Sequence, residues 1–331
     1  MAYSVLIDPA LKNNSGEPSD NLGDLIISED IRRILADLFP KENFIPVSPH
    51  LPFASKEKQI INSANFVFVG GSNILTSDIR HFPRLSPEKI KGFYLFPGFK
   101  NLVLIGTGWN RYDTKPDWAT RIFYRKILHR KLLHSLRDQY SANHLQSARI
   151  ANLLFTGCPT TWNLDPYFRN SFEAKHPILC TLTDYNRNVD QDNQLLYNVV
   201  EYSNSITYFY PQGSEDISYL QSLTFYQNNK SKFKSLPRCY NHFKDIISDG
   251  RLNYIGTRLH AGIKCLQHKI PSLIIGIDNR AWEMGQDLSL PVVARNETSI
   301  IGHWVEKKRA TSTIKLPYEN IKKWKDQFQS L

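Results

Sequence analysis

The segment from Leu252 to Met284, "LNYIGTRLHAGIKCLQHKIPSLIIGIDNRAWEM", places charged residues where an apolar strand is expected to turn into a helix. "LNYIG" is typical of a buried strand, and in "TRLHAGIKCLQHK" the residues Leu259, Ile263 and Leu266 recur at helical spacing. Thr257 is expected to cap this helix. The free N–H groups and the positive dipole end at a helix start attract anions, so the segment predicts an anion-binding site.

Three charged side chains of this segment could act on a bound anion. Arg258 can hold a carboxylate or a phosphate through two parallel hydrogen bonds. His260 and Lys264 are four residues apart and share a helical face, whereas Arg258 and His260 lie about 200° apart around the axis. A bound dianion favours the protonated imidazole, which suits His260 as a general acid. The alternative is a solvated arginine beside a histidine that only packs.

A second candidate group lies near the N-terminus in "SDNLGDLIISED". Asn21, Gly23 and Asp24 are expected in a flexible loop that enters a long helix. Glycine allows close backbone approach, and Asp24 could accept from sugar hydroxyls or act as a base. An ordinary helix start with an acidic first turn is the alternative.

Further candidates follow other apolar runs. "VGGSN" and "IGTG" end strands in glycine, but they lack the spacing of a dinucleotide fingerprint or a P-loop, so a tight turn is the favoured interpretation of each motif taken alone. Arg137 in "SLRD" should point into the same cleft, or form an ion pair with Asp138. Gln212 and Gly213 in "YPQG" precede a helix, where they could bind a phosphate or only cap the helix.

Strand-like and helix-like stretches alternate through most of the chain. "YSVLID", "NFIPVS", "NFVFVGG", "NLVLIGTG", "KLLHSLRD" and "NLLFTGCP" are typical of buried parallel strands, and helical patterns lie between several of them. The pattern restarts after the Pro- and Asn-rich stretch of residues 159–177. We therefore predict an α/β protein with two doubly wound, Rossmann-like domains facing a cleft, residues 1–165 and 176–315, followed by a closing helix at 316–331.

Composition limits the possible partners and locations. Lys and Arg exceed Asp and Glu by 41 − 31 = 10, which favours anionic partners. The basic stretch Arg121–Arg137 is expected to be helical, with a solvated basic face favoured over contact with a membrane or a polyanion. There is no membrane-span pattern or signal peptide, so a cytoplasmic protein is expected. The four cysteines are scattered and no metal-ligand spacing occurs, so neither disulfides nor a metal are expected.

Taken in order, "DNLGD", "VGGSN", "IGTG", "RD", "FTGCPT", "YPQG" and "GTRLHAGIKCLQHKIPSLIIGIDNR" resemble the polysaccharide pyruvyl transferase family. The similarity runs from about Asn21 to Arg295, and "TRLHAGI…P" is its most specific part. The N-terminal loop is longer than the family's compact "GxxNxGD". "DNRAWEMGQDLSLPVVAR" resembles one bacterial branch, although Arg280 and Glu283 could form a structural pair.

The resemblance implies a two-domain fold like the GT-B glycosyltransferases. It also implies transfer of pyruvate from phosphoenolpyruvate to two hydroxyls of a sugar as a ketal, during assembly of a surface polysaccharide. On this basis the catalytic residues are His260, Arg258 and Asp24. The substrate-binding residues are Arg137, Lys264, Gln212, Gly213, Asn21, Gly23, Gly71, Thr107, Asn279 and Arg280.

This scheme requires no metal and no organic cofactor, and its partners are phosphoenolpyruvate and a saccharide. We expect no nucleic-acid partner. Attachment of the saccharide to a lipid, contact with the inner membrane face and the oligomeric state are left open. Two other functions also remain open: a nucleotide-sugar-dependent GT-B glycosyltransferase, and a non-enzymatic binder of a polyanion or a membrane.

Overall fold

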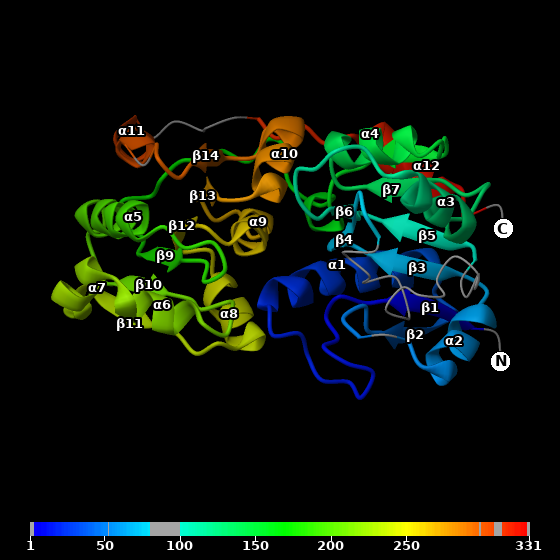
Figure 1. Ribbon diagram of the computed structural model, residues 1–331. Coiled ribbons are helices and arrows are strands. Elements are labelled where there is room, and N and C mark those ends of the chain that lie inside the picture. The colour runs from blue at the N-terminus through cyan, green and yellow to red at the C-terminus, as the bar shows by residue number, and fades with distance from the viewer. Residues whose placement is uncertain (1–2, 52, 80–99, 298, 308–312, 330–331) are drawn as a thin grey trace. The chain divides into compact units, whose positions relative to one another are not determined.

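The computed structural model describes residues 3–51, 53–79, 100–297, 299–307 and 313–329 (Figure 1). The chain forms two compact units. Unit 1 contains Met1–Ser19, Ile27–Trp162 and Leu316–Leu331, and unit 2 contains Asp20–Ile26 and Asn163–Lys315. Each unit has a parallel β-sheet with helices around it, so the predicted α/β class is confirmed.

Unit 1 contains a four-stranded parallel sheet in the order β2-β1-β3-β5. Its strands are β1 (Tyr3–Ile7), β2 (Asn43–Val47), β3 (Val67–Gly70) and β5 (Leu102–Ile105). Two shorter parallel pairs join β4 (Asn73–Leu75) to β6 (Gly108–Trp109) and β7 (His134–Leu136) to β8 (Leu153–Phe155). All six apolar runs expected to be strands in this half of the chain form them.

Helices cover both faces of the unit 1 sheet because its strands are apolar on both sides. In β1, Val5 and Ile7 belong to one buried cluster and Leu6 belongs to another. The helices are α1 (Leu22–Leu38), α2 (Ser55–Asn62), α3 (Trp118–Ile127), α4 (Gln139–Ser147) and α12 (Tyr318–Asp326). The cluster that contains Leu6 also contains Ile31 of α1 and Trp324 of α12. The C-terminal helix therefore completes the core of the unit in which the chain begins.

Unit 2 contains a six-stranded parallel sheet in the order β11-β10-β9-β12-β13-β14. The strands are β9 (Ile178–Thr181), β10 (Thr207–Phe209), β11 (Phe233–Ser235), β12 (Asn253–Gly256), β13 (Ser272–Gly276) and β14 (Val292–Ala294). The helices are α5 (Val189–Glu201), α6 (Asp216–Ser222), α7 (Thr224–Asn228), α8 (Tyr240–Ile247), α9 (Leu259–Gln267), α10 (Asn279–Leu288) and α11 (Ser299–Lys307). This strand order is that of a Rossmann fold.

The order of the strands in unit 2 identifies where a ligand should bind. From β9 the chain adds β10 and β11 on one side, and then returns to add β12, β13 and β14 on the other side. The direction therefore reverses between β9 and β12. In open α/β sheets, ligands bind at this reversal, beyond the carboxyl ends of the strands.

One predicted helix is shorter than expected. The basic stretch Arg121–Arg137 is not a single helix, because α3 ends at Ile127 and the next residue is extended. Leu128 pairs with Leu102 of β5, and residues 134–136 form β7. The continuous basic helix that was predicted is therefore divided between a helix and a strand. Among the described residues no helix combines the length and the apolar character needed to cross a membrane.

The buried His134 makes the stability of unit 1 depend on pH. His134 Nδ1 accepts from the Leu104 N–H at 3.2 Å, and Nε2 lies 3.0 Å from the carbonyl oxygen of His129. Burial lowers the pKa of His134 from 6.5 to about 4, although the hydrogen bond to His129 partly opposes this. Both contacts fit a neutral ring that carries its proton on Nε2.

We expect the free energy of unfolding to fall as the pH drops from about 6.5 to about 4. In that window the unfolded chain binds a proton at His134 and the folded chain does not, so the slope reaches about 1.4 kcal/mol per pH unit. Urea unfolding of the wild type and of His134→Asn across this pH range measures how the free energy of unfolding of each protein depends on pH. The prediction is contradicted if both proteins lose stability at the same rate.

Candidate functional site

The candidate site of unit 2 lies where four strands end. Asp184 follows β9, Gln212 follows β10, Arg258 follows β12 and Asp278 follows β13. Gln212, Arg258 and Asp278 line one small pocket together with His260 of α9. The pocket is therefore at the strand reversal where this fold binds its ligands.

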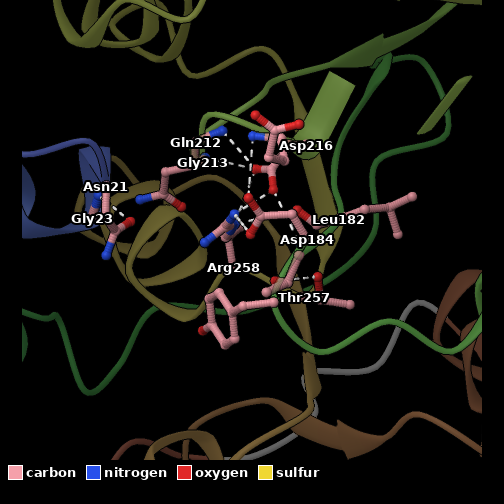
Figure 2. Close-up of polar contacts among 12 residues, drawn as sticks. Asn21, Gly23, Leu182, Asp184, Gln212, Gly213, Asp216, Thr257 and Arg258 are labelled. Carbon is pink, nitrogen blue, oxygen red and sulfur yellow. Dashed lines mark hydrogen bonds and ion pairs between the residues drawn. The ribbon is translucent and has the colours of Figure 1, made fainter. Parts of the chain in front are cut away.

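Arg258 is almost fully buried and is held by two carboxylates (Figure 2). Its Nε donates to Asp216 Oδ2 at 3.1 Å, and its Nη2 donates to Asp216 Oδ1 and to Asp184 Oδ1, the latter at 3.0 Å. The two-bond contact predicted for a substrate anion is thus made with Asp216 in this structure. Among the described residues nothing accepts a hydrogen bond from Nη1, so this nitrogen is what Arg258 can offer to a ligand.

Asp216 joins the ends of three strands, and the sequence analysis did not select it. Its side chain is fully buried and accepts from the backbone N–H groups of Gln212 and Gly213, both at 2.8 Å, and of Asp184 at 3.1 Å. Gln212 and Gly213 were expected to bind a phosphate. In the structure their backbone N–H groups donate to Asp216 instead. The one local signal was an acidic residue in the first turn of a helix, three residues after Gly213, and it does not indicate the arginine partner.

Gly213 makes the close approach of the charged groups possible. A Cβ atom at this position would lie 2.2 Å from Arg258 Nη2 and 2.9 Å from Asp184 Oδ2. Any larger residue would push the guanidinium away from its carboxylates. The role of Gly213 in this structure is therefore to leave space for Arg258.

The helix that carries His260 starts later than predicted. α9 begins at Leu259, and no side chain caps its first turn. Thr257, the predicted cap, instead bonds through its hydroxyl to the hydroxyl of Thr183 at 2.8 Å. His260 lies in the first turn and lines the pocket, and Lys264 lies one turn later, with both side chains buried.

At the start of α10 a second arginine is paired. Asp278 caps this helix by accepting from Ala281 N–H at 3.2 Å, and it also forms an ion pair with Arg280. The proposed pairing of Arg280 with Glu283 is therefore replaced by one with Asp278. Burial disfavours the charged form of Arg280, but Tyr185 and Asp278 outweigh it and raise the pKa of Arg280. Asn279, also predicted to bind substrate, is the first residue of α10 and is buried.

Residues near the N-terminus complete the wall of this pocket. Asn21 and Gly23 line it, and the Leu22 N–H donates to the Gln212 carbonyl oxygen at 3.0 Å. Gly23 and Asp24 lie in the first turn of α1 rather than in the flexible loop that was predicted. Asn21 Oδ1 accepts from the Gly23 N–H at 3.1 Å, which orders this turn.

The other predicted substrate-binding residues belong to unit 1. Gly71 and Thr107 follow β3 and β5, and Arg137 follows β7. Arg137 is buried, and its guanidinium contacts Asp138 at 3.1 Å and Asn73 Oδ1 at 2.7 Å. The alternative of an ion pair with Asp138 is therefore what the structure contains.

The chemical capacity of the unit 2 pocket follows from these contacts. Arg258 and Arg280 are each paired with aspartate, so an anion in this pocket would depend mainly on Arg258 Nη1 and the helix starts. His260 can hold or release a proton beside that anion. Among the residues that the structure describes, no three His, Cys, Asp or Glu side chains gather as a metal site.

Comparison with known proteins places this chain in a family. A family model described as polysaccharide pyruvyl transferase matches residues 21–279, well over half of the chain. The chain belongs to this family. The predicted family is thus confirmed, and the matched range includes the pocket residues from Asn21 to Asp278. No curated protein sequence matches the chain.

Solved structures share the fold of this pyruvyl transferase family member at low sequence identity. The UDP-GlcNAc 2-epimerase of Methanocaldococcus jannaschii, in complex with UDP-GlcNAc and UDP, has a TM-score of 0.56 at 14% identity, covering 100% of this chain and 99% of that one. S. aureus MnaA with UDP has a TM-score of 0.53 at 9% identity, covering 96% and 92%. These are GT-B-like proteins, so the predicted fold of two Rossmann-like domains is confirmed.

We expect Asp216→Ala to lower the free energy of unfolding by about 3–5 kcal/mol, because it leaves a buried guanidinium without its main partner. Asp249→Ala is the matched control, since Asp249 also pairs with an arginine but is exposed, and it should change stability little. Urea unfolding monitored by circular dichroism gives both values. Equal stability of the two variants would contradict this account of Asp216.

Proposed function

We propose that the protein transfers pyruvate from phosphoenolpyruvate to two hydroxyls of a saccharide, forming a cyclic ketal and releasing phosphate. The observation that supports this most is the placement of Arg258 and His260 together in a buried pocket at the strand reversal, in a chain of the pyruvyl transferase family. The process in which we place the reaction is the assembly of a surface polysaccharide. The acceptor can be a free or a lipid-linked saccharide.

The reaction needs one proton donor and at least one proton acceptor. A proton is added to the methylene carbon of phosphoenolpyruvate, which becomes the methyl group, and the adjacent carbon takes on oxocarbenium character. One hydroxyl adds to that carbon, the C–O bond to phosphate breaks, and the second hydroxyl closes the ring. The two hydroxyls together lose two protons; one balances the proton added to carbon and the other leaves with phosphate.

His260 is proposed to supply the proton to carbon, because it lies in the first turn of α9 within the pocket. A helix start disfavours the charged imidazole, whereas a bound carboxylate and phosphate favour it, so charging of His260 would follow donor binding. Arg258 would contribute Nη1 to the anion while Asp216 fixes its guanidinium. Asp24, half-buried in the first turn of α1, would accept a hydroxyl proton.

We expect His260→Ala to lower kcat by roughly 100- to 10,000-fold, the usual effect of losing a general acid. Phosphate release from phosphoenolpyruvate, measured with free and lipid-linked saccharides, gives the rates. His303→Ala, an exposed histidine on α11, is the control and should keep the wild-type rate.

Two results would overturn the proposal. One is a folded His260→Ala protein that releases phosphate at the wild-type rate. The other is a wild type that is stabilised against heat by UDP-GlcNAc but not by phosphoenolpyruvate, since a ligand raises the melting temperature of the state it binds. The second result would favour the nucleotide-sugar-dependent alternative, as would glycosyl transfer to the same saccharides.

A further inference from the structure

The side-chain amide of Gln212 is buried in the pocket without a hydrogen-bond partner. Gln212 is 1% exposed, and its Oε1 is shielded from solvent and bonded to none of the described residues. No described residue bonds to the amide nitrogen either. A buried polar group left unsatisfied costs about 1–3 kcal/mol, so a protein retains such a group where it serves another purpose.

The backbone around this amide is fixed from both sides. The Gln212 N–H donates to Asp216 at 2.8 Å, and the Gln212 carbonyl oxygen accepts from Leu22 N–H at 3.0 Å. Figure 2 shows the side chain of Gln212 pointing toward Asn21 and Gly23. These hydrogen bonds hold the backbone of Gln212 in place. The polar atoms of its side-chain amide take no part in them.

Gly23 has no side chain and so leaves space for the side-chain amide of Gln212. A Cβ atom on Gly23 would lie 2.9 Å from Gln212 Nε2, closer than side-chain atoms normally approach. Gly23 and Gln212 line the same pocket as Arg258 and His260. An amide whose oxygen is buried and unsatisfied thus shares the pocket with the groups assigned to the donor.

The chemistry of an amide restricts what this position can bind. It offers one acceptor oxygen and two N–H donors, whereas ionised phosphate and carboxylate groups only accept. Phosphoenolpyruvate could therefore not satisfy Gln212 Oε1. A sugar hydroxyl both donates and accepts, and two neighbouring hydroxyls can meet both ends of the amide.

We propose that Gln212 binds the hydroxyls of the saccharide acceptor and determines the specificity of the pocket for them. This inference rests on the proposed function, and it divides the pocket into two parts. The donor is assigned to the side of Arg258 and His260, and the acceptor to the side of Gln212 and Gly23. A site built to bond a hydroxyl rejects ligands that lack it, because its own polar atoms would stay unpaired.

The inference predicts that a variant without the side-chain amide binds the saccharide more weakly but loses no stability. Gln212→Met keeps the length of the side chain and removes the buried, unsatisfied amide oxygen, so the melting temperature should rise or stay unchanged. Binding of the saccharide should weaken roughly tenfold or more, as expected for a lost hydrogen bond that leaves ligand hydroxyls unpaired. A residue with only a structural role would lose stability instead. Gln221→Met, on the exposed side of α6, is the matched control and should change neither quantity.

The experiment measures calorimetric binding of methyl glycosides of glucose, galactose and mannose, and of their deoxy analogues, without phosphoenolpyruvate. We expect the wild type to bind a glycoside, Gln212→Met to bind it more weakly, and removal of one hydroxyl to cost the wild type more than the variant. The KM for phosphoenolpyruvate should stay within about twofold in Gln212→Met.

Three results would overturn the inference: a wild type that binds none of these glycosides, a variant that binds them equally well, or a variant whose melting temperature falls. Gly23→Ala provides a second variant that leaves Gln212 and Asp216 in place, and it should also weaken glycoside binding. Glycoside binding that depends on Gln212 without any phosphate release from phosphoenolpyruvate would overturn the proposed reaction and leave this inference standing.

Discussion

The contact between Arg258 and Asp216 is the interaction on which the site depends. Asp216 receives hydrogen bonds from this guanidinium and from three backbone amides, and so connects the ends of β9, β10 and β12. A buried arginine is costly unless its charge is neutralised, and a buried carboxylate is costly unless it is saturated with donors. Each group therefore requires the other, and together they fix the loops that line the pocket.

Most hydrogen-bonding capacity around the pocket is used internally, which makes the remaining groups selective. Asp216 and Asp184 occupy Arg258, while Asp278 and Tyr185 occupy Arg280. The groups with capacity left for a ligand include Nη1 of Arg258 and the amide of Gln212. A ligand must match these few directions and cannot rely on a broad positive field. Such preorganisation lowers the ordering cost of binding a ligand that fits these directions.

The sequence predicted the fold better than the contacts of the site. Buried strands such as β3 and β13 are runs of apolar residues ended by glycine, so they can be recognised locally. β11 was missed because only Phe233 of its residues is buried. Strand β14, whose three residues are all half-buried, was also missed. Helix α3 was predicted to be too long because basic residues continue past Ile127, where the backbone becomes extended.

For the site, Arg258 and His260 could be found because their charges interrupt an apolar strand–helix pattern. The partners of Arg258 could not, since Asp216 and Asp184 are 42 and 74 residues away in the sequence. A carboxylate gives no local sign of the arginine that it will meet after folding. Gly213 likewise carries a packing requirement set by side chains far away in the sequence.

Unit 2 is discontinuous in sequence, since it takes residues 20–26 from the beginning of the chain. These residues supply Asn21 and Gly23 to a pocket whose other walls come from residues 185–281. A fragment of residues 163–315 alone would retain Arg258, Asp216 and His260 but would lack one wall of its own binding site. A complete pocket of unit 2 therefore cannot be obtained by cutting the chain between Trp162 and Asn163.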